Sequence, residues 1–94
     1  MATVVTISFE LRIHGCRSLK EKRTVVRSIV DRLRNGLNVS VAETAFQDIH
    51  DRAELTVALV ASDARLADSL ADRVDRMVVE RSHALVVATR REVV

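Results

Sequence analysis

The chain contains no proline, tryptophan or tyrosine, and it has only two glycines, two phenylalanines and one cysteine. So few flexible or helix-breaking residues exclude a long disordered linker or a low-complexity tail. A single cysteine cannot form an internal disulfide, which excludes the small secreted scaffolds that disulfide bonds hold together. The 94 residues are therefore expected to fold as one domain around a hydrophobic core.

Long hydrophobic runs are also missing. The longest uncharged segment, residues 1–9, is too short for a helix that crosses a bilayer. The same segment lacks the positively charged start of a signal peptide. We therefore expect no membrane partner and a cytoplasmic location.

Four segments have the character of β-strands. Residues 3–13 and 53–61 alternate between apolar and polar side chains, with the period of two that is typical of a strand with one buried face. Residues 38–45 alternate less regularly, which indicates a strand with a bulge near Glu43. Residues 84 to about 90 are predicted to form the last strand.

Two amphipathic helices separate these strands. Ser18 opens the first helix and is expected to form a capping box, in which its side-chain oxygen caps the helix and Glu21 accepts from the Ser18 N–H. This helix is predicted to run to about Asn35 and to stop at Gly36, a residue type common after helix ends.

The second helix is predicted to begin at Ser62 or Asp63 and to continue to about Arg81. The resulting β-α-β-β-α-β order, with short connections and right-handed crossovers, favours a ferredoxin-like α+β sandwich. Its four antiparallel strands should lie in the order 4-1-3-2, with both helices on one face. The predicted core includes Ile7, Phe9, Leu11, Ile29, Leu33, Val57, Leu59, Leu66, Leu70 and Met77.

Positive charge is concentrated in the first predicted helix, although the formal net charge of the whole chain is only +2. Residues 17–34 contain seven basic and two acidic side chains, a local net charge of +5. At about 100° per residue, four of the cations fall within an arc of about 60° on the exposed side of the helix. These four are Lys20, Arg23, Arg27 and Arg34.

Two interpretations of this basic arc stay open. In the first interpretation, the arc is an ordinary solvated face, because lysine and arginine favour helices. In the second, the arc is a surface that binds an anionic partner such as RNA, and the free N–H groups at the start of the helix also bind it. The residues expected to bind that partner are Arg17, Ser18, Lys20, Lys22, Arg23, Arg27 and Arg34.

The start of the first helix also carries a specific string, Arg17-Ser18-Leu19-Lys20-Glu21-Lys22-Arg23. With Asn38-Val39-Ser40-Val41-Ala42-Glu43, Gln47-Asp48 and Arg52-Ala53, it resembles the YlxP-like family of small bacterial proteins. The family commonly has a Pro-Gly pair in the loop where this chain has His14-Gly15-Cys16. The resemblance implies a ferredoxin-like fold and an RNA or ribosome context, because family members tend to be encoded near translation and ribosome-maturation factors.

One common mode of RNA binding is excluded by the strand residues. Many ferredoxin-like domains stack RNA bases on aromatic side chains of the two central strands. The outward positions of those strands here hold Thr6, Ser8, Glu10, Arg12, Glu54, Thr56 and Ala58. None is aromatic, and both glutamates repel phosphate, so RNA contact is expected through the first helix. We therefore expect a binding module with no catalytic residue, metal or cofactor.

The alternative is a small enzyme or ligand-binding accessory protein that uses one end of the sheet. The predicted topology should bring together His14, Cys16, Gln47, Asp48, His50 and Asp51, with Arg81 and His83 at the same end. Such residues can bind a transition metal, although no pair has the local spacing of a chelate. Cys16 is the candidate nucleophile, because a helix N-terminus and Arg17 should lower the pKa of its thiol.

A homodimer is also expected. The predicted sheet has one bare face, and its last strand carries small side chains at Ala84 and Ala88 that leave the edge unprotected. Pairing of edges or packing of sheet faces would cover these surfaces. In the second arrangement, Glu10 of one copy would pair with Arg12 of the other across a two-fold axis.

Overall fold

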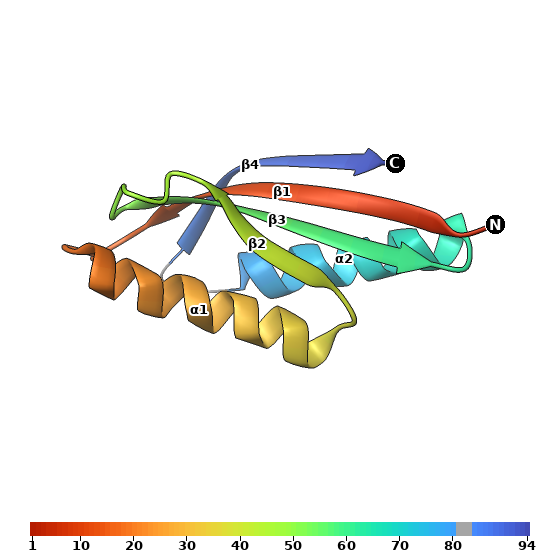
Figure 1. The fold of residues 1–94 in the computed structure, drawn as a ribbon, viewed down its shortest axis with the longest axis horizontal. Helices are drawn as coiled ribbons and strands as arrows, with labels where there is room; N and C mark the ends of the chain where they lie inside the picture. Colours follow the sequence, from red (N-terminus) through yellow and green to blue (C-terminus); the bar gives the residue numbers. More distant parts are fainter. Residues whose placement is uncertain (81–83) are drawn as a thin grey trace.

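The computed structural model describes residues 1–80 and 84–94. Its elements are β1 (Thr3–Ile13), α1 (Leu19–Gly36), β2 (Ser40–Ala45), β3 (Arg52–Ala61), α2 (Ala64–Val79) and β4 (Ala84–Val93). The strands form one antiparallel sheet in the order β2-β3-β1-β4, with both helices on the same face (Figure 1). The predicted ferredoxin-like βαββαβ fold and its strand order are confirmed.

The core lies between the sheet and the helices. In the central pair of strands, Ile7 lies opposite Val57 and Phe9 opposite Leu55, and all four side chains are buried. The alternation of β1 and β3 therefore directs one face of each strand into the interior, as predicted. Burying a side chain of this size stabilises a fold by about 1.5–3 kcal/mol, so these two strands are major contributors to stability.

Each edge strand has one notable feature, a bulge in β2 and an unexpected length in β4. The pairing of β2 with β3 shifts register between Glu43 and Ala45, which confirms the bulge predicted near Glu43. The last strand is longer than predicted, because its pairing with β1 continues to Val93 opposite Val5. The prediction that it ends near Arg90 is wrong, since the residues after Arg90 lack the apolar alternation from which a strand is recognised.

The start of α1 has the predicted cap with one difference. The Glu21 backbone N–H donates to Ser18 Oγ at 3.2 Å. The reciprocal bond of the capping box comes from the Arg17 N–H, which donates to Glu21 Oε2 at 2.6 Å. The expected bond from the Ser18 N–H to Glu21 is therefore wrong by one residue.

The end of α1 differs by about one residue from the expected position, whereas the start of α2 agrees with the prediction. Gly36 is the last residue of α1, and the capping residue is Leu37, whose N–H donates to Leu33 O at 2.9 Å. Asp63 caps the start of α2, where its side chain accepts from the Leu66 N–H at 2.8 Å. Glu80 caps the other end of α2, and the predicted end at Arg81 lies outside the described residues.

The two helices meet only over part of their length. Figure 1 shows that α2 extends along the sheet beyond the end of α1. Gly36 at that end lies against Met77, because a Cβ on Gly36 would be 3.0 Å from Met77 Cε. The flank of α2 beyond this contact has no helix beside it, so Leu66 is 44% exposed and Leu70 is only partly buried. The prediction of Leu66 as a core residue is wrong for this reason.

Candidate anion-binding face

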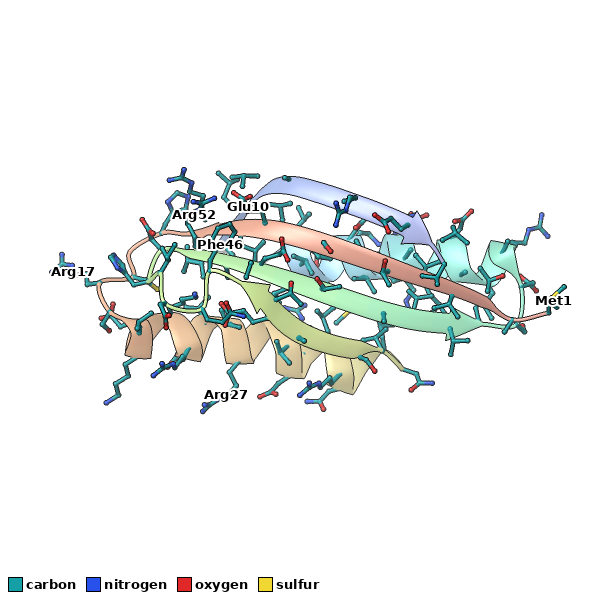
Figure 2. The ribbon with its side chains drawn as sticks, turned by 45° about the horizontal axis from the view of Figure 1, so that its top comes forward. Met1, Glu10, Arg17, Arg27, Phe46 and Arg52 are labelled. Atoms are coloured by element: carbon teal, nitrogen blue, oxygen red, sulfur yellow. The ribbon has the colours of Figure 1, made fainter. Side chains whose placement is uncertain are left out.

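Three cations form an exposed row on α1. The side chains of Lys20, Arg23 and Arg27 are exposed, and none forms an ion pair with another described residue. Figure 2 shows Arg27 projecting from α1 away from the sheet. At 1.5 Å per residue, the row extends about 10 Å along the helix axis. The structure thus presents the basic arc on the surface, as the helical spacing predicted.

Arg34 continues the row and fixes its position in the fold. Its Nη2 atom donates to Val41 O of β2 at 2.8 Å. Because β2 is an edge strand, this bond places the basic side of α1 at the margin of the domain. A guanidinium has five N–H donors, so Arg34 keeps capacity for another acceptor.

Lys22 lies inside the protein. It is 1% exposed, its Nζ atom is 2.8 Å from Glu43 Oε2, and it donates to Phe46 O at 2.5 Å. The prediction that Lys22 contacts a partner is therefore wrong. Lys22 follows Lys20 by about 200° around the helix, between the buried positions of Val26 and Ile29. This angular position was the sequence signal that identifies Lys22 as an interior residue.

The N-terminus of α1 offers fewer free donors than an uncapped helix. The capping bonds of Ser18 and Glu21 occupy the N–H groups of Glu21 and Arg17. The Glu21 carboxylate also places negative charge there, which weakens the attraction for an anion. Ser18 therefore acts as a cap, while the exposed Arg17 side chain extends from the tip of the domain (Figure 2).

A chain of contacts connects α1 to the open face of the sheet. Lys22 binds the carbonyl of Phe46, which has the left-handed backbone angle φ = 64°. The Arg52 guanidinium lies over the Phe46 ring, 4.1 Å from its centroid, and donates to Glu10 Oε2 at 3.0 Å. Figure 2 shows Phe46, Arg52 and Glu10 together at one end of the sheet. No local sequence pattern indicates this network, because its members are distant along the chain.

The open face of the sheet is lined by hydroxyl and carboxylate groups. The hydroxyls of Ser8 and Thr44 lie 3.1 and 2.8 Å from that of Thr56, and Thr44 donates to Glu54 at 2.5 Å. A shallow hollow of about 200 Å³ lies beside them, lined by Ser8, Glu10, Glu54, Ala88, Thr89 and Arg90. No aromatic ring lines this hollow, and its two glutamates oppose the approach of phosphate.

The alternative ligand end is brought together only in part. The Ile13 N–H donates to Asp51 O at 2.9 Å, so the end of β1 lies beside the β2–β3 connection, as predicted. Gln47 donates to Glu43 O at 3.4 Å. The remaining predicted members in the described ranges, His14, Asp48 and His50, are exposed. Within residues 1–80 and 84–94, no three His, Cys, Asp or Glu side chains form a group that could hold a metal ion. Arg81 and His83 lie outside the described residues.

Cys16 is partly buried against the core. Burial raises the pKa of its thiol, and the negative charge of Glu21 raises it further. The prediction that the helix N-terminus and Arg17 make this thiol more acidic is therefore wrong. At neutral pH Cys16 keeps its proton, which is the unreactive form of a cysteine.

Comparisons with known proteins agree with this fold. The family model described as "Protein of unknown function (DUF503)" matches residues 4–91. Over 53 residues the chain is 42% identical to "Uncharacterized protein YlxP" of Bacillus subtilis (strain 168). These aligned residues cover 56% of this chain and 58% of that protein. The match thus spans little more than half the length of this relative.

Among solved structures, "De novo designed protein Foldit4" is similar with a TM-score of 0.58 and 14% sequence identity. The similarity covers 100% of this chain and 97% of the designed chain, and it concerns the fold alone. In the described ranges, no helix is long and apolar enough to cross a membrane. On the match over residues 4–91, the chain belongs to the DUF503, YlxP-like family of proteins of unknown function.

Proposed function

We propose that this protein is a non-enzymatic binding module that holds RNA, or a particle that contains RNA, against the basic side of α1. The observation that supports the proposal is the row of Lys20, Arg23 and Arg27, exposed and without an ion pair to any described residue. Like charges spaced three or four residues apart on a helix repel one another. An anionic partner removes this repulsion, whereas no described residue offsets it through an ion pair with these cations.

The spacing of the row suits a polymer better than a single small anion. Successive cations lie about 4.5 and 6 Å apart along the axis, and Arg34 extends the row to about 21 Å. One phosphate cannot contact all of these groups at once, whereas the backbone of a nucleic acid can. Each phosphate contact releases counterions, so three or four contacts predict that log K falls with log salt with a slope of about −3. This proposal implies a cytoplasmic location.

The experiment is a titration of fluorescently labelled RNA, followed by anisotropy at several salt concentrations. The test variant is Arg23→Glu/Arg27→Glu, and the control is Arg73→Glu/Arg76→Glu, which makes the same charge change on exposed positions of α2. We expect the test variant to weaken binding by about tenfold or more and the control to change it much less. Cys16→Ala should bind like the unmodified protein. Equal losses in the two double variants, or no RNA binding at all, would refute the proposal.

We further propose that two copies associate through the free edges of β4. This edge strand has ten residues, and Leu85 and Val87 on it are 53% and 43% exposed. The other edge strand, β2, lies beside the basic row, where a second copy would bring like charges together. Glu10 already binds Arg52 within its own chain, which weakens the alternative pairing with Arg12 of a second copy.

The test is the molar mass in solution measured by light scattering. Leu85→Lys/Val87→Lys should convert the dimer to a monomer, because two buried charges oppose the pairing of edges. Val60→Lys is the matched control, since Val60 is also exposed but belongs to the inner strand β3. A dimer that only Val60→Lys disrupts would point to contact between sheet faces and overturn the edge arrangement.

A further inference from the structure

We infer that the RNA held by α1 is a double helix, recognised through its shape and phosphates without stacking of bases. This inference rests on the proposed function and names the class of RNA. Three features of the described residues carry it: the lack of an aromatic residue in α1, the fixed place of that helix in the fold, and the excess of positive charge on one margin.

The helix that carries the basic row contains no aromatic residue on which a base could stack. The whole chain contains two phenylalanines and no tyrosine or tryptophan. Phe9 is 1% exposed on the helix side of the sheet, and the Arg52 guanidinium occupies one face of the half-buried Phe46 ring, 4.1 Å from its centroid. Proteins that hold single strands without sequence preference commonly stack successive bases on aromatic rings, each worth about 1–3 kcal/mol. The basic row lacks that source of affinity, whereas a duplex keeps its bases stacked internally.

The helix that carries the basic row is held in a fixed place in the fold. Val26, Ile29 and Leu33 anchor the opposite side of α1 in the core. Arg34 is tied to Val41 O of β2. The spacings between the helix positions of the row are therefore fixed. The phosphates of a duplex also have fixed spacings, so the backbone of a duplex loses little conformational entropy when it binds. A flexible single strand loses more conformational entropy when it is aligned on such a row.

The excess of positive charge on α1 does not continue around the domain. Glu10 and Glu54 accompany Arg90 at the hollow of the open face. The three arginines of α2 are matched by three aspartates, Asp68, Asp72 and Asp75. Proteins that bind single strands combine stacking rings with a basic groove that follows the backbone. A convex basic margin, by contrast, suits a ligand that is contacted from one side. Double-stranded RNA is such a ligand, because its wide, shallow minor groove is recognised by shape and by backbone contacts.

The experiment compares three unlabelled competitors for a bound fluorescent RNA duplex. They are a mixed-sequence RNA duplex of about 20 base pairs, each of its single strands alone, and the DNA duplex of the same sequence. At equal phosphate concentration we expect the RNA duplex to compete about tenfold better than either single strand. A duplex of scrambled sequence should compete equally well. The Arg23→Glu/Arg27→Glu variant should lose the RNA duplex, and Arg73→Glu/Arg76→Glu should retain it.

Each other outcome has a distinct meaning. If the single strands compete as well as the duplex, and Arg23→Glu/Arg27→Glu still abolishes binding, the inference is wrong and the proposed function stands. If the DNA duplex competes as well as the RNA duplex, the assignment to RNA is wrong. If no nucleic acid binds, or both double variants fail equally, the proposed function itself is wrong.

Discussion

Lys22 of α1 and Glu43 of β2 form an ion pair within the domain, with 2.8 Å between Nζ and Oε2. The same ammonium group donates to the carbonyl of Phe46, so it ties the helix to the β2–β3 connection. Lys20, two residues earlier, is exposed and has no ion pair with a described residue. The basic helix therefore contains cations of two kinds, one internal brace and a row that faces solvent.

The first prediction separates these two kinds by stability. Lys22→Ala should lower the free energy of unfolding by about 3 kcal/mol, because it leaves Glu43 and the Phe46 carbonyl without their partner. Glu43 is 22% exposed, which places the loss at the lower end of the range for buried pairs. Lys20→Ala and Arg23→Ala should change stability by less than about 0.5 kcal/mol. Urea unfolding followed by circular dichroism measures all three, and similar losses throughout would make the exposed cations structural.

A second prediction concerns the cap of α1. Ser18→Ala should destabilise the protein by about 1 kcal/mol, because the Glu21 N–H loses the acceptor Ser18 Oγ. Ser69→Ala, on the exposed side of α2, is the control and should be neutral or slightly stabilising, since alanine favours helices. Thermal unfolding of both variants provides the comparison. An unchanged midpoint for Ser18→Ala would show that the cap contributes nothing.

The third prediction is that the Cys16 thiol reacts slowly. Only the thiolate is alkylated, and burial together with Glu21 raises the pKa of this thiol. Iodoacetamide should therefore modify the folded protein more slowly than a free cysteine peptide at pH 8. The pH at which the alkylation rate reaches half of its maximum should be higher for the folded protein than for the peptide. Glu21→Gln should lower this midpoint pH part of the way toward that of the peptide. Unfolding in urea should restore the ordinary rate. A midpoint below that of the peptide would support the alternative of a nucleophilic Cys16.

The fourth prediction compares two neighbouring arginines of β4. Arg91 donates to Asp72 Oδ1 at 3.2 Å and to Asp75 Oδ2 at 2.7 Å of α2. Burial lowers the pKa of Arg91, but the bonds to both aspartates outweigh it and leave that pKa raised. Arg91→Ala should cost about 1 kcal/mol of stability, since the group is partly exposed, and the loss should shrink in high salt.

Arg90→Ala is the control for this prediction. Arg90 forms an ion pair with Glu92 at 3.2 Å, but both side chains are largely exposed, so its removal should have almost no effect. Unfolding at low and at high salt gives the comparison. If Arg91→Ala lowers the free energy of unfolding no more than Arg90→Ala does, the ion pairs of Arg91 with Asp72 and Asp75 add no stability.

Local sequence patterns predicted most of the fold. The alternation in residues 3–13 and 53–61 placed the two central strands, and the break near Glu43 located a bulge. These predictions succeed because the direction of a strand side chain depends on its position along the strand. The end of β4 was missed because its last residues, Arg91 to Val93, are held by pairing with β1. Leu66 was wrongly predicted to lie in the core, because the spacing of residues on α2 does not show that α1 ends before it reaches Leu66 (Figure 1).

The sequence by itself determined which cations share one side of α1 and where that helix is capped, since both depend on residues within a few turns. Only the tertiary structure decided which charged groups remain available. It paired Lys22 with Glu43, joined Glu10 to Arg52, bound Arg34 to Val41 of β2, and partly buried Cys16 against the core. The physical reason is that desolvation and ion pairing depend on groups brought from distant parts of the chain. The spacing of residues along one helix contains no record of those groups.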